Sequence, residues 1–254
     1  TSLGWRYPNP AMEALFPLES MGETAENVQS LTGISRERQD AFALQSHQRA
    51  IQAIEKGEFK DEISAYQIMD RVADLDSREV RINSKLASQD EGPRADTSLE
   101  ALAKLKTVFA QKGSVTAGNS SQLSDGAGAV LLVSEAALKR YNLTPIGKFL
   151  GFNVSGVPPE IMGIGPKEAV PRVLKQVGLT LNDIGWIELN EAFAAQSLAV
   201  IQDLGLDPAL GVALDPADPL LRGAGEGAFL VAEERALDQL LADGRAVHLD
   251  EGLV

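Results

Sequence analysis

The sequence contains no cysteine and only two histidines, His47 and His248. Without cysteine, the chain can form no disulfide and no thiolate zinc site, and it offers no cysteine nucleophile of its own. Imidazole chemistry is confined to the two histidines. His47 lies on the apolar stripe of a predicted helix, where a packed histidine is far more common than a catalytic one. His248 lies near an acidic end of the sequence, and we expect it to face solvent.

Long apolar runs and positive charge are scarce as well. No run approaches the roughly 18 apolar residues of a membrane helix, and no basic-then-apolar leader follows Thr1. We therefore expect a soluble, cytoplasmic protein with no membrane partner. The formal net charge is −13, which disfavours nucleic acid as a partner. Residues 201–254 alone contain 11 acidic side chains against three arginines, so the remainder could still present a basic pocket to an anionic ligand.

What the sequence does contain is typical of a globular protein of one large or two modest domains, with 44% hydrophobic and 23% charged residues. Residues 1–33 contain prolines at short intervals, which predicts an irregular segment. Ser35 and Gly57 bracket a predicted helix over 36–56, with Ala41, Leu44, Ile51 and Ile54 as its apolar stripe. The polar stretch that follows includes Val80–Ile82, a candidate edge strand.

Further along, Thr97–Glu100 has the pattern of a capping box and predicts a short helix through Lys106. Gly113–Ser121 is a run of small residues where backbone can approach a ligand closely. The apolar run Ala129–Val133 predicts a buried strand, and Ser134 is a candidate cap for the helix after it.

The second half alternates strands and helices. Gly163–Pro166 leads into a helix that ends at Gly178, although Pro171 would also suit its first turn. Ile184–Leu189 predicts a strand, Glu191–Leu204 a helix, and Ala228–Asp243 an acidic helix. This order predicts α/β layering, with a domain boundary near residue 121.

Five segments, taken in order and spacing, resemble the thiolase family over about residues 1–208. The segments are Met21–Asn27, Ser35–Arg49, Gly113–Asp125, Met162–Pro166 and Asn190–Gln196. The resemblance implies an α/β protein with the thiolase-like layered αβαβα fold, incomplete here, and a mixed α+β loop domain. It implies a coenzyme A-binding loop domain over 1–120 and part of the thiolase core over 121–254, with a divergent acidic segment from about 209.

The resemblance also implies a reaction, the Claisen condensation of two acyl-CoA molecules or its thiolytic reverse. Family members use two cysteines, a Gly-His-Pro histidine and an asparagine that holds a water in the oxyanion site. Only the asparagine has a counterpart, Asn190 in Asn190-Glu191-Ala192-Phe193. We expect the nucleophile to lie upstream of Thr1, and Arg222 falls near the expected histidine. Position alone favours a helix N-cap for Asn190, whereas the Glu191-Ala192-Phe193 that follows favours the family role.

The resemblance assigns coenzyme-binding roles to six further residues. Arg94 falls where the family stacks an arginine on adenine, a role that suits a planar cation, although a solvated surface arginine is the ordinary alternative. Ser121 matches a serine that hydrogen-bonds the pantetheine amide, and its alternative is turn chemistry. Residues that match the apolar walls of the pantetheine tunnel, with plain core packing as the alternative, are Met162, Phe109, Ala192 and Phe193. Ser20 stands where many members carry a histidine.

We expect coenzyme A or acyl-CoA as substrate, no covalently bound cofactor and no metal site. Asp215 and Asp218 alternate with prolines and are typical of a turn, and Gly163–Pro166 lacks the third glycine of a dinucleotide fingerprint. Three readings stay open: an acyl-CoA-binding thiolase polypeptide that is inactive alone, a non-catalytic subunit that pairs with a complete thiolase, or a scaffold that binds nothing. The family implies a dimer or tetramer, and an incomplete core predicts exposed apolar strand faces.

Overall fold

The structure, a computed structural model, describes residues 7–74, 76–124, 129–145 and 147–206, together with the backbone of 229–232. The α-helices are α1 (Pro10–Glu13), α2 (Met21–Thr32), α3 (Arg36–Lys56), α4 (Leu99–Ala103), α5 (Glu135–Tyr141), α6 (Gly165–Val177) and α7 (Ala194–Leu204). The 3₁₀-helices are η1 (Pro159–Ile164) and η2 (Leu181–Asp183), and the strands are β1 (Tyr66–Ala73), β2 (Val80–Ala87), β3 (Ile184–Glu188) and β4 (Phe229–Ala232).

Helix α2 lies within a segment that the prolines predicted to be irregular, so that prediction was wrong for Met21–Thr32. Its start is a capping box. The Ser20 hydroxyl accepts from the Glu23 backbone N–H at 3.4 Å, and the Glu23 carboxylate accepts from the Ser20 backbone N–H at 2.6 Å. Gly33 ends the helix with a φ of 68°, which favours glycine. The signal Ser20-x-x-Glu23 was present in the sequence.

Helix α3 has the predicted bounds, with Ser35 as N-cap and Gly57 as a left-handed C-cap at a φ of 77°. Its buried face differs from the predicted stripe, because Ala41 is exposed. The buried residues of α3 are Gln39, Asp40, Ala43 and Ala53. Two of these are polar, so hydrophobicity alone could not locate this face.

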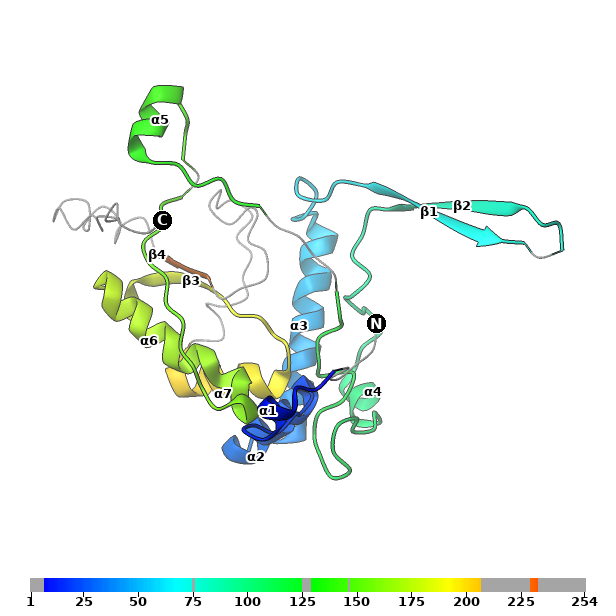
Figure 1. The fold of residues 1–254 in the computed structure, drawn as a ribbon, viewed down its shortest axis with the longest axis horizontal. Coiled ribbons are helices and arrows are strands. Elements are labelled where there is room, and N and C mark those ends of the chain that lie inside the picture. Colours follow the sequence, from blue (N-terminus) through cyan, green and yellow to red (C-terminus); the bar gives the residue numbers. More distant parts are fainter. Residues whose placement is uncertain (1–6, 75, 125–128, 146, 207–228, 233–254) are drawn as a thin grey trace.

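Strands β1 and β2 form an antiparallel hairpin that extends away from the helices (Figure 1). The pairing runs from Tyr66 opposite Ala87 to Ala73 opposite Val80, which confirms a strand at Val80–Ile82. Nearly all of its residues are exposed.

The principal core lies where α2, α3, α7 and η1 pack together. Its buried cluster is Val28, Ile34, Ile164 and Ala199, with Ile161 and Leu198 packed against it. A second cluster, around Leu174 and Ile184, joins α6 to β3.

The helices α4, α5 and α6 refine the predicted boundaries. Ser98, rather than Thr97, is the N-cap of α4, which ends at Ala103. Ser134 is the N-cap of α5, as predicted. Helix α6 begins at Gly165 and contains Pro171, so the alternative start at Pro171 was wrong. Pro166 occupies the first turn, where its missing N–H costs nothing.

Strand β3 was predicted, and α7 begins three residues later than expected. Phe193 is extended, with φ −145° and ψ 138°, because residues 192–194 bond to residues 119–121 rather than continuing the helix backwards.

Two predictions about the second half were wrong. Residues 129–133 form no strand, and the exposed fractions of Val130, Leu131 and Leu132 are 81%, 84% and 77%. A strand needs a neighbour for its backbone groups, and no strand in the described ranges pairs with this run. Residues 229–232 form β4, antiparallel to β3, where a helix was expected. The rest of that predicted helix lies outside the described residues. The same holds for Asp215, Asp218, Arg222 and His248.

Candidate functional site

The small-residue loop 113–121 is bound to α2 by a buried carboxylate. Glu26, 7% exposed, accepts the backbone N–H groups of Ser114 and Val115 at 2.9 and 2.8 Å. Gly113 lies so close that an added Cβ would collide with the Glu26 carboxylate. The sequence requires glycine at residue 113 because the carboxylate and the loop backbone share that space.

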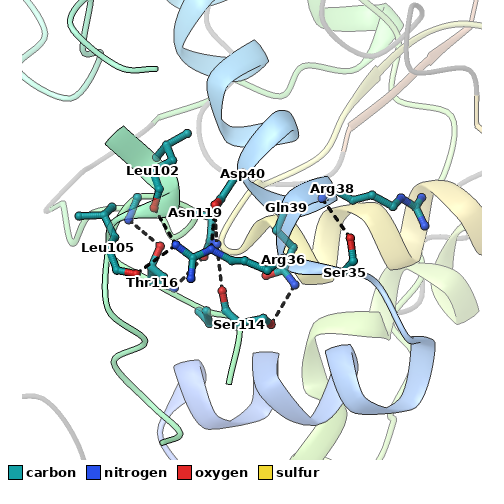
Figure 2. Close-up of polar contacts among 12 residues, drawn as sticks. Ser35, Arg36, Arg38, Gln39, Asp40, Leu102, Leu105, Ser114, Thr116 and Asn119 are labelled. Atoms are coloured by element: carbon teal, nitrogen blue, oxygen red, sulfur yellow. Dashed lines mark hydrogen bonds and ion pairs between the residues drawn. The ribbon is translucent and has the colours of Figure 1, made fainter. Parts of the chain in front are cut away.

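A second set of contacts binds the loop to α3 (Figure 2). Asn119 Nδ2 donates to Asp40 Oδ1 at 2.9 Å, and Asn119 Oδ1 accepts the Thr116 N–H at 2.8 Å. Gln39 Nε2 donates to the Ser114 hydroxyl at 2.9 Å. Each of these side chains is buried, so their hydrogen bonds replace the water that the loop would otherwise need.

Arg36 extends this network to α4. Its Nε donates to Asp40 Oδ2 at 2.8 Å, while its Nη2 donates to the carbonyl oxygens of Leu102 and Leu105 at 2.7 and 3.1 Å (Figure 2). Leu102 lies in the last turn of α4, where its carbonyl also accepts the Leu105 N–H at 3.0 Å, and Leu105 follows the helix, so the guanidinium adds a charged donor to the C-terminal end of α4. The loop therefore lies on a frame built from α2, α3 and α4.

The end of the loop pairs with the segment before α7. The Ser121 N–H donates to the Ala192 carbonyl at 2.9 Å, and the Ala194 N–H donates to the Asn119 carbonyl at 3.0 Å. Ser120 and Phe193 form the bridge between them. Three predicted site residues, Ser121, Ala192 and Phe193, are thus brought together, and Ser121 is exposed.

The predicted apolar residues lie around the start of α7. Phe109 and Phe193 meet edge to face, with ring centroids 6.2 Å apart and planes at 87°. Gly22 lies directly against the Phe109 ring, where a larger residue would collide. Met162 is 51% exposed and precedes Gly163, whose added Cβ would lie 2.7 Å from Gln196 Cγ. Met162 thus lies one residue before a contact with the first turn of α7, and its side chain is available as apolar surface.

The segment that precedes Arg94 contacts the same loop end. Gly92 is packed against Gln122, since a Cβ at Gly92 would lie 2.7 Å from the Gln122 amide nitrogen. Gly92 is two residues before Arg94, and Gln122 directly follows Ser121, so this contact joins the two segments. The Arg94 guanidinium donates to both oxygens of Asp96, at 3.2 and 3.0 Å. This pairing lowers the pKa of the Asp96 carboxyl and raises that of Arg94.

The Arg94 backbone N–H donates to His47 Nδ1 at 3.2 Å. The His47 ring is therefore neutral at that nitrogen in this arrangement. Burial, followed by the nearby Arg94 charge, lowers the pKa of His47 below 6.5, while Asp96 opposes the shift. The sequence favoured a packed histidine, and His47 is indeed partly buried. Its contact with the Arg94 loop was missed, because the two residues are far apart in the sequence.

Asn190 is exposed, two residues after β3 and four before α7. It is not the N-cap of α7, because Phe193 occupies that position, so the simple capping alternative was wrong. The adjacent Glu191 accepts from the Ser46 hydroxyl at 2.6 Å. Burial is the largest influence on the Glu191 carboxyl and raises its pKa, while the bond from Ser46 acts in the opposite direction. Sequence reasoning missed Ser46 and Glu191 as neighbours.

Ser20 is the N-cap of α2, a role that needs no ligand. Within the described ranges, no cluster of three or more histidine or acidic side chains has the geometry to bind a metal ion. No helix in those ranges combines the length and apolarity needed to cross a membrane.

Comparison with known proteins assigns this arrangement to a family. A family model described as the thiolase N-terminal domain matches residues 8–136, and one described as the thiolase C-terminal domain matches residues 143–214. The 3-ketoacyl-CoA thiolase of Bacillus subtilis is 49% identical over 202 residues, which cover 79% of this chain and 51% of that protein. The acetyl-CoA acetyltransferase of Pseudomonas aeruginosa is 49% identical over 189 residues, 74% of this chain and 46% of that protein.

Solved structures agree with the sequence comparison. The Bacillus anthracis acetyl-CoA acetyltransferase matches with a TM-score of 0.70 at 41% identity, covering 87% of this chain and 55% of that one. Human mitochondrial 3-ketoacyl-CoA thiolase in complex with CoA matches with a TM-score of 0.67 at 38% identity, covering 90% and 53%. The chain belongs to the thiolase family and has a thiolase-like αβ fold, as the five segments predicted. It spans about half the length of the curated relatives that it matches.

Proposed function

We propose that this chain binds coenzyme A thioesters as a thiolase-type polypeptide and that, alone, it catalyses neither condensation nor thiolysis. The observation that carries the proposal is the pairing of residues 119–121 with residues 192–194. This pairing brings the exposed Ser121 next to Ala192 and Phe193, and the Arg94 loop lies beside the same loop end.

The chemistry of these residues suits the parts of coenzyme A. Arg94 offers a planar cation for adenine stacking or phosphate. Ser121 offers a hydroxyl to a pantetheine amide. Phe109, Phe193 and Met162 offer apolar surface to the pantetheine chain and the acyl group. The Bacillus subtilis and Pseudomonas aeruginosa relatives have names that refer to acyl-CoA chemistry, which supports the same ligand class here.

The proposed lack of catalysis rests on the sequence. Forming a carbon–carbon bond between two thioesters through a covalent acyl intermediate needs a thiol nucleophile and a base for the enolate. The sequence has no cysteine. Asn190 is proposed to hold a water in the oxyanion site, and a water alone supplies neither group. Thiolysis of acetoacetyl-CoA by the purified 254-residue chain would contradict this part of the proposal.

Calorimetric titration with coenzyme A tests the binding. Replacing Arg94 with alanine should weaken binding about tenfold, since a stacked or phosphate-bound guanidinium contributes roughly 1–2 kcal/mol to such contacts. Arg81→Ala is the matched control, because Arg81 is 65% exposed and pairs with Asp74 much as Arg94, 66% exposed, pairs with Asp96. No heat from the parent chain, or equal weakening by both variants, contradicts the proposal.

A second candidate function is a non-catalytic subunit that pairs with a complete thiolase. The exposed apolar residues Val130, Leu131 and Leu132 favour it, since exposed apolar runs typically contact a partner. Co-purification with a cysteine-containing homologue from the cytoplasm, where we propose the chain is located, would support this function. A lone monomer in sedimentation, with no homologue in pull-downs, would count against it.

A further inference from the structure

Two consecutive residues of α3 contact two different loops. The Ser46 hydroxyl donates to Glu191 Oε2 at 2.6 Å. The next residue, His47, accepts the Arg94 backbone N–H at Nδ1, at 3.2 Å. Ser46 and Glu191 are 145 positions apart in the sequence, and His47 and Arg94 are 47 apart. One short stretch of helix therefore joins segments that the chain itself separates widely.

These loops carry opposite ends of the proposed coenzyme site. Glu191 lies between Asn190, proposed for the thioester end, and Ala192, which is bonded to Ser121. Arg94 is proposed for the adenine end. Helix α3 is well suited to hold both loops at fixed positions, because it is a single element of 21 residues with a cap at each end. Its N-terminal half is also bound to the loop 113–121 through the buried contact of Asp40 with Asn119.

We infer that Ser46 and His47 are positioning residues: Ser46 fixes the loop at the thioester end, and His47 fixes the loop at the adenine end, from adjacent points on α3. The inference rests on the proposed function, because it assigns each residue to one end of that site. Neither residue needs to touch the ligand. A loop that loses its contact with α3 would hold its binding group in a wider range of positions. Ligand binding would then have to order the loop, which lowers the affinity.

The chemistry of the two contacts differs. The His47 contact needs the ring neutral, because a proton on Nδ1 would place two N–H groups face to face. The charged groups that face this ring are Arg94 and Asp96. The Ser46 contact survives either protonation state of Glu191, since the hydroxyl is the donor and a carboxyl or a carboxylate can accept. Arg49 and Glu188 are the charged groups near Glu191. Acidification should therefore release the adenine-end loop only.

Ligand fragments separate the two roles. The parent chain is titrated with 3′-phosphoadenosine 5′-diphosphate and, separately, with pantetheine. His47→Leu, which removes the acceptor at similar size, should weaken the nucleotide about fivefold and leave pantetheine within about twofold, as expected for one neutral hydrogen bond. Ser46→Ala should do the reverse. His47→Asn and Ser46→Thr, which keep an acceptor and a hydroxyl, should restore binding.

Amide hydrogen exchange without ligand provides the second measurement. His47→Leu should speed exchange around Arg94 and not around Glu191, while Ser46→Ala should speed it around Glu191 and not around Arg94. Selective changes in both measurements support the inference. Equal weakening of both fragments by both variants, or unchanged exchange in both loops, overturns it. If the parent binds neither fragment, the proposed function fails, and the exchange data alone decide whether Ser46 and His47 position these loops.

Discussion

Glu26 accepts the backbone N–H of Ser114 with both of its carboxylate oxygens, at 2.9 Å each. The same carboxylate accepts the Val115 N–H at 2.8 Å. A side chain on α2 thus supplies the hydrogen bonds that a neighbouring strand would supply in a sheet. The site proposed for coenzyme A begins at the far end of this loop, so we expect the Glu26 carboxylate, together with the contacts from α3, to stabilise the loop and the site.

Replacing Glu26 with alanine should lower the free energy of unfolding by about 2–4 kcal/mol, because two buried backbone N–H groups lose their charged acceptor. Urea unfolding followed by circular dichroism measures the change. Glu62→Ala, at an exposed acidic residue, is the control and should change stability by less than about 0.5 kcal/mol. Similar values for the two variants would show that the Glu26 contacts contribute nothing.

Gly113→Ala should disturb the contact between Glu26 and the loop, and so lower the free energy of unfolding. The added Cβ would overlap the Glu26 carboxylate, so either the loop or α2 must shift, at a cost of about 1–3 kcal/mol. Gly156→Ala is the matched control, since a Cβ at Gly156 meets no atom of the described part of the chain within 4 Å. Combining Gly113→Ala with Glu26→Ala in a double-mutant cycle should give clearly less than the sum of the two losses. Additive losses would mean that the two residues do not act on one contact.

Local signals in the sequence predicted α3, α4, α5, α6 and α7 but missed α2, and long-range contacts limited the rest. Ser35 and Gly57 fix both ends of α3 by local chemistry, and the structure confirmed them. The buried face of α3 could not be predicted, because Gln39 and Asp40 are buried only when Ser114 and Asn119 supply partners 75 and 79 residues away. The run at 129–133 has the composition of a buried strand, but composition does not supply a neighbouring strand, and here the run is exposed.

The candidate site shows the same division. The motif around Asn190 and the small-residue loop were recognisable as sequence patterns, and the pairing of Ser121 with Ala192 brings them together. The contacts that support them were not predicted. Ser46 lies within the segment Ser35–Arg49, but the segment assigns it no role, and its bond to Glu191 depends on how α3 packs beside α7. The partners of a supporting residue such as Ser46 lie far away in the sequence, so its contact appears only once the chain is folded.

Arg36→Lys tests the buried network on α3. Arginine reaches Asp40 and the carbonyls of Leu102 and Leu105 at once, and a lysine ammonium cannot span all three from one position. We expect a loss of about 1–3 kcal/mol in the free energy of unfolding. Arg38→Lys, two residues away on the same helix, is the control, because the Arg38 guanidinium contacts a single side chain among the described residues, Gln202, at 3.4 and 3.5 Å. An equal loss in both variants would contradict a special role for Arg36.

Asp96→Asn should strengthen coenzyme A binding. The Asp96 carboxylate accepts hydrogen bonds from Nε and Nη2 of Arg94, so these two donors are not available to a ligand. Its negative charge should also repel an incoming phosphate. Because the pair is exposed, its contribution is modest, and we expect an affinity gain of up to about fivefold, largest at low salt. Asp74→Asn, at the similarly placed partner of Arg81, should leave the affinity unchanged. Weaker binding by the Asp96 variant would mean that the carboxylate orients Arg94 for the ligand instead of competing with it.

Glu191→Gln should stabilise the chain at neutral pH and lose this advantage in acid. Burial raises the pKa of the Glu191 carboxyl above 4.5 in the folded protein, so the folded state binds a proton more readily than the unfolded state. The stabilising contribution of the carboxyl is therefore complete below its unfolded pKa and is lost as pH rises through its folded pKa. Glutamine keeps an acceptor for the Ser46 hydroxyl and removes the charge.

The free energy of unfolding measured in urea at about pH 8 should thus be higher for Glu191→Gln than for the parent, and the difference should shrink towards zero at about pH 4. Glu62→Gln, at an exposed residue, controls for the general loss of one negative charge from a chain of net charge −13. A gain that is equal at both pH values, or matched by the control, would show that desolvation of Glu191 is not its cause. A loss at about pH 8 would mean that the attraction to Arg49 outweighs burial, and the carboxylate would then be a stabilising part of the contact between α3 and the Asn190 loop.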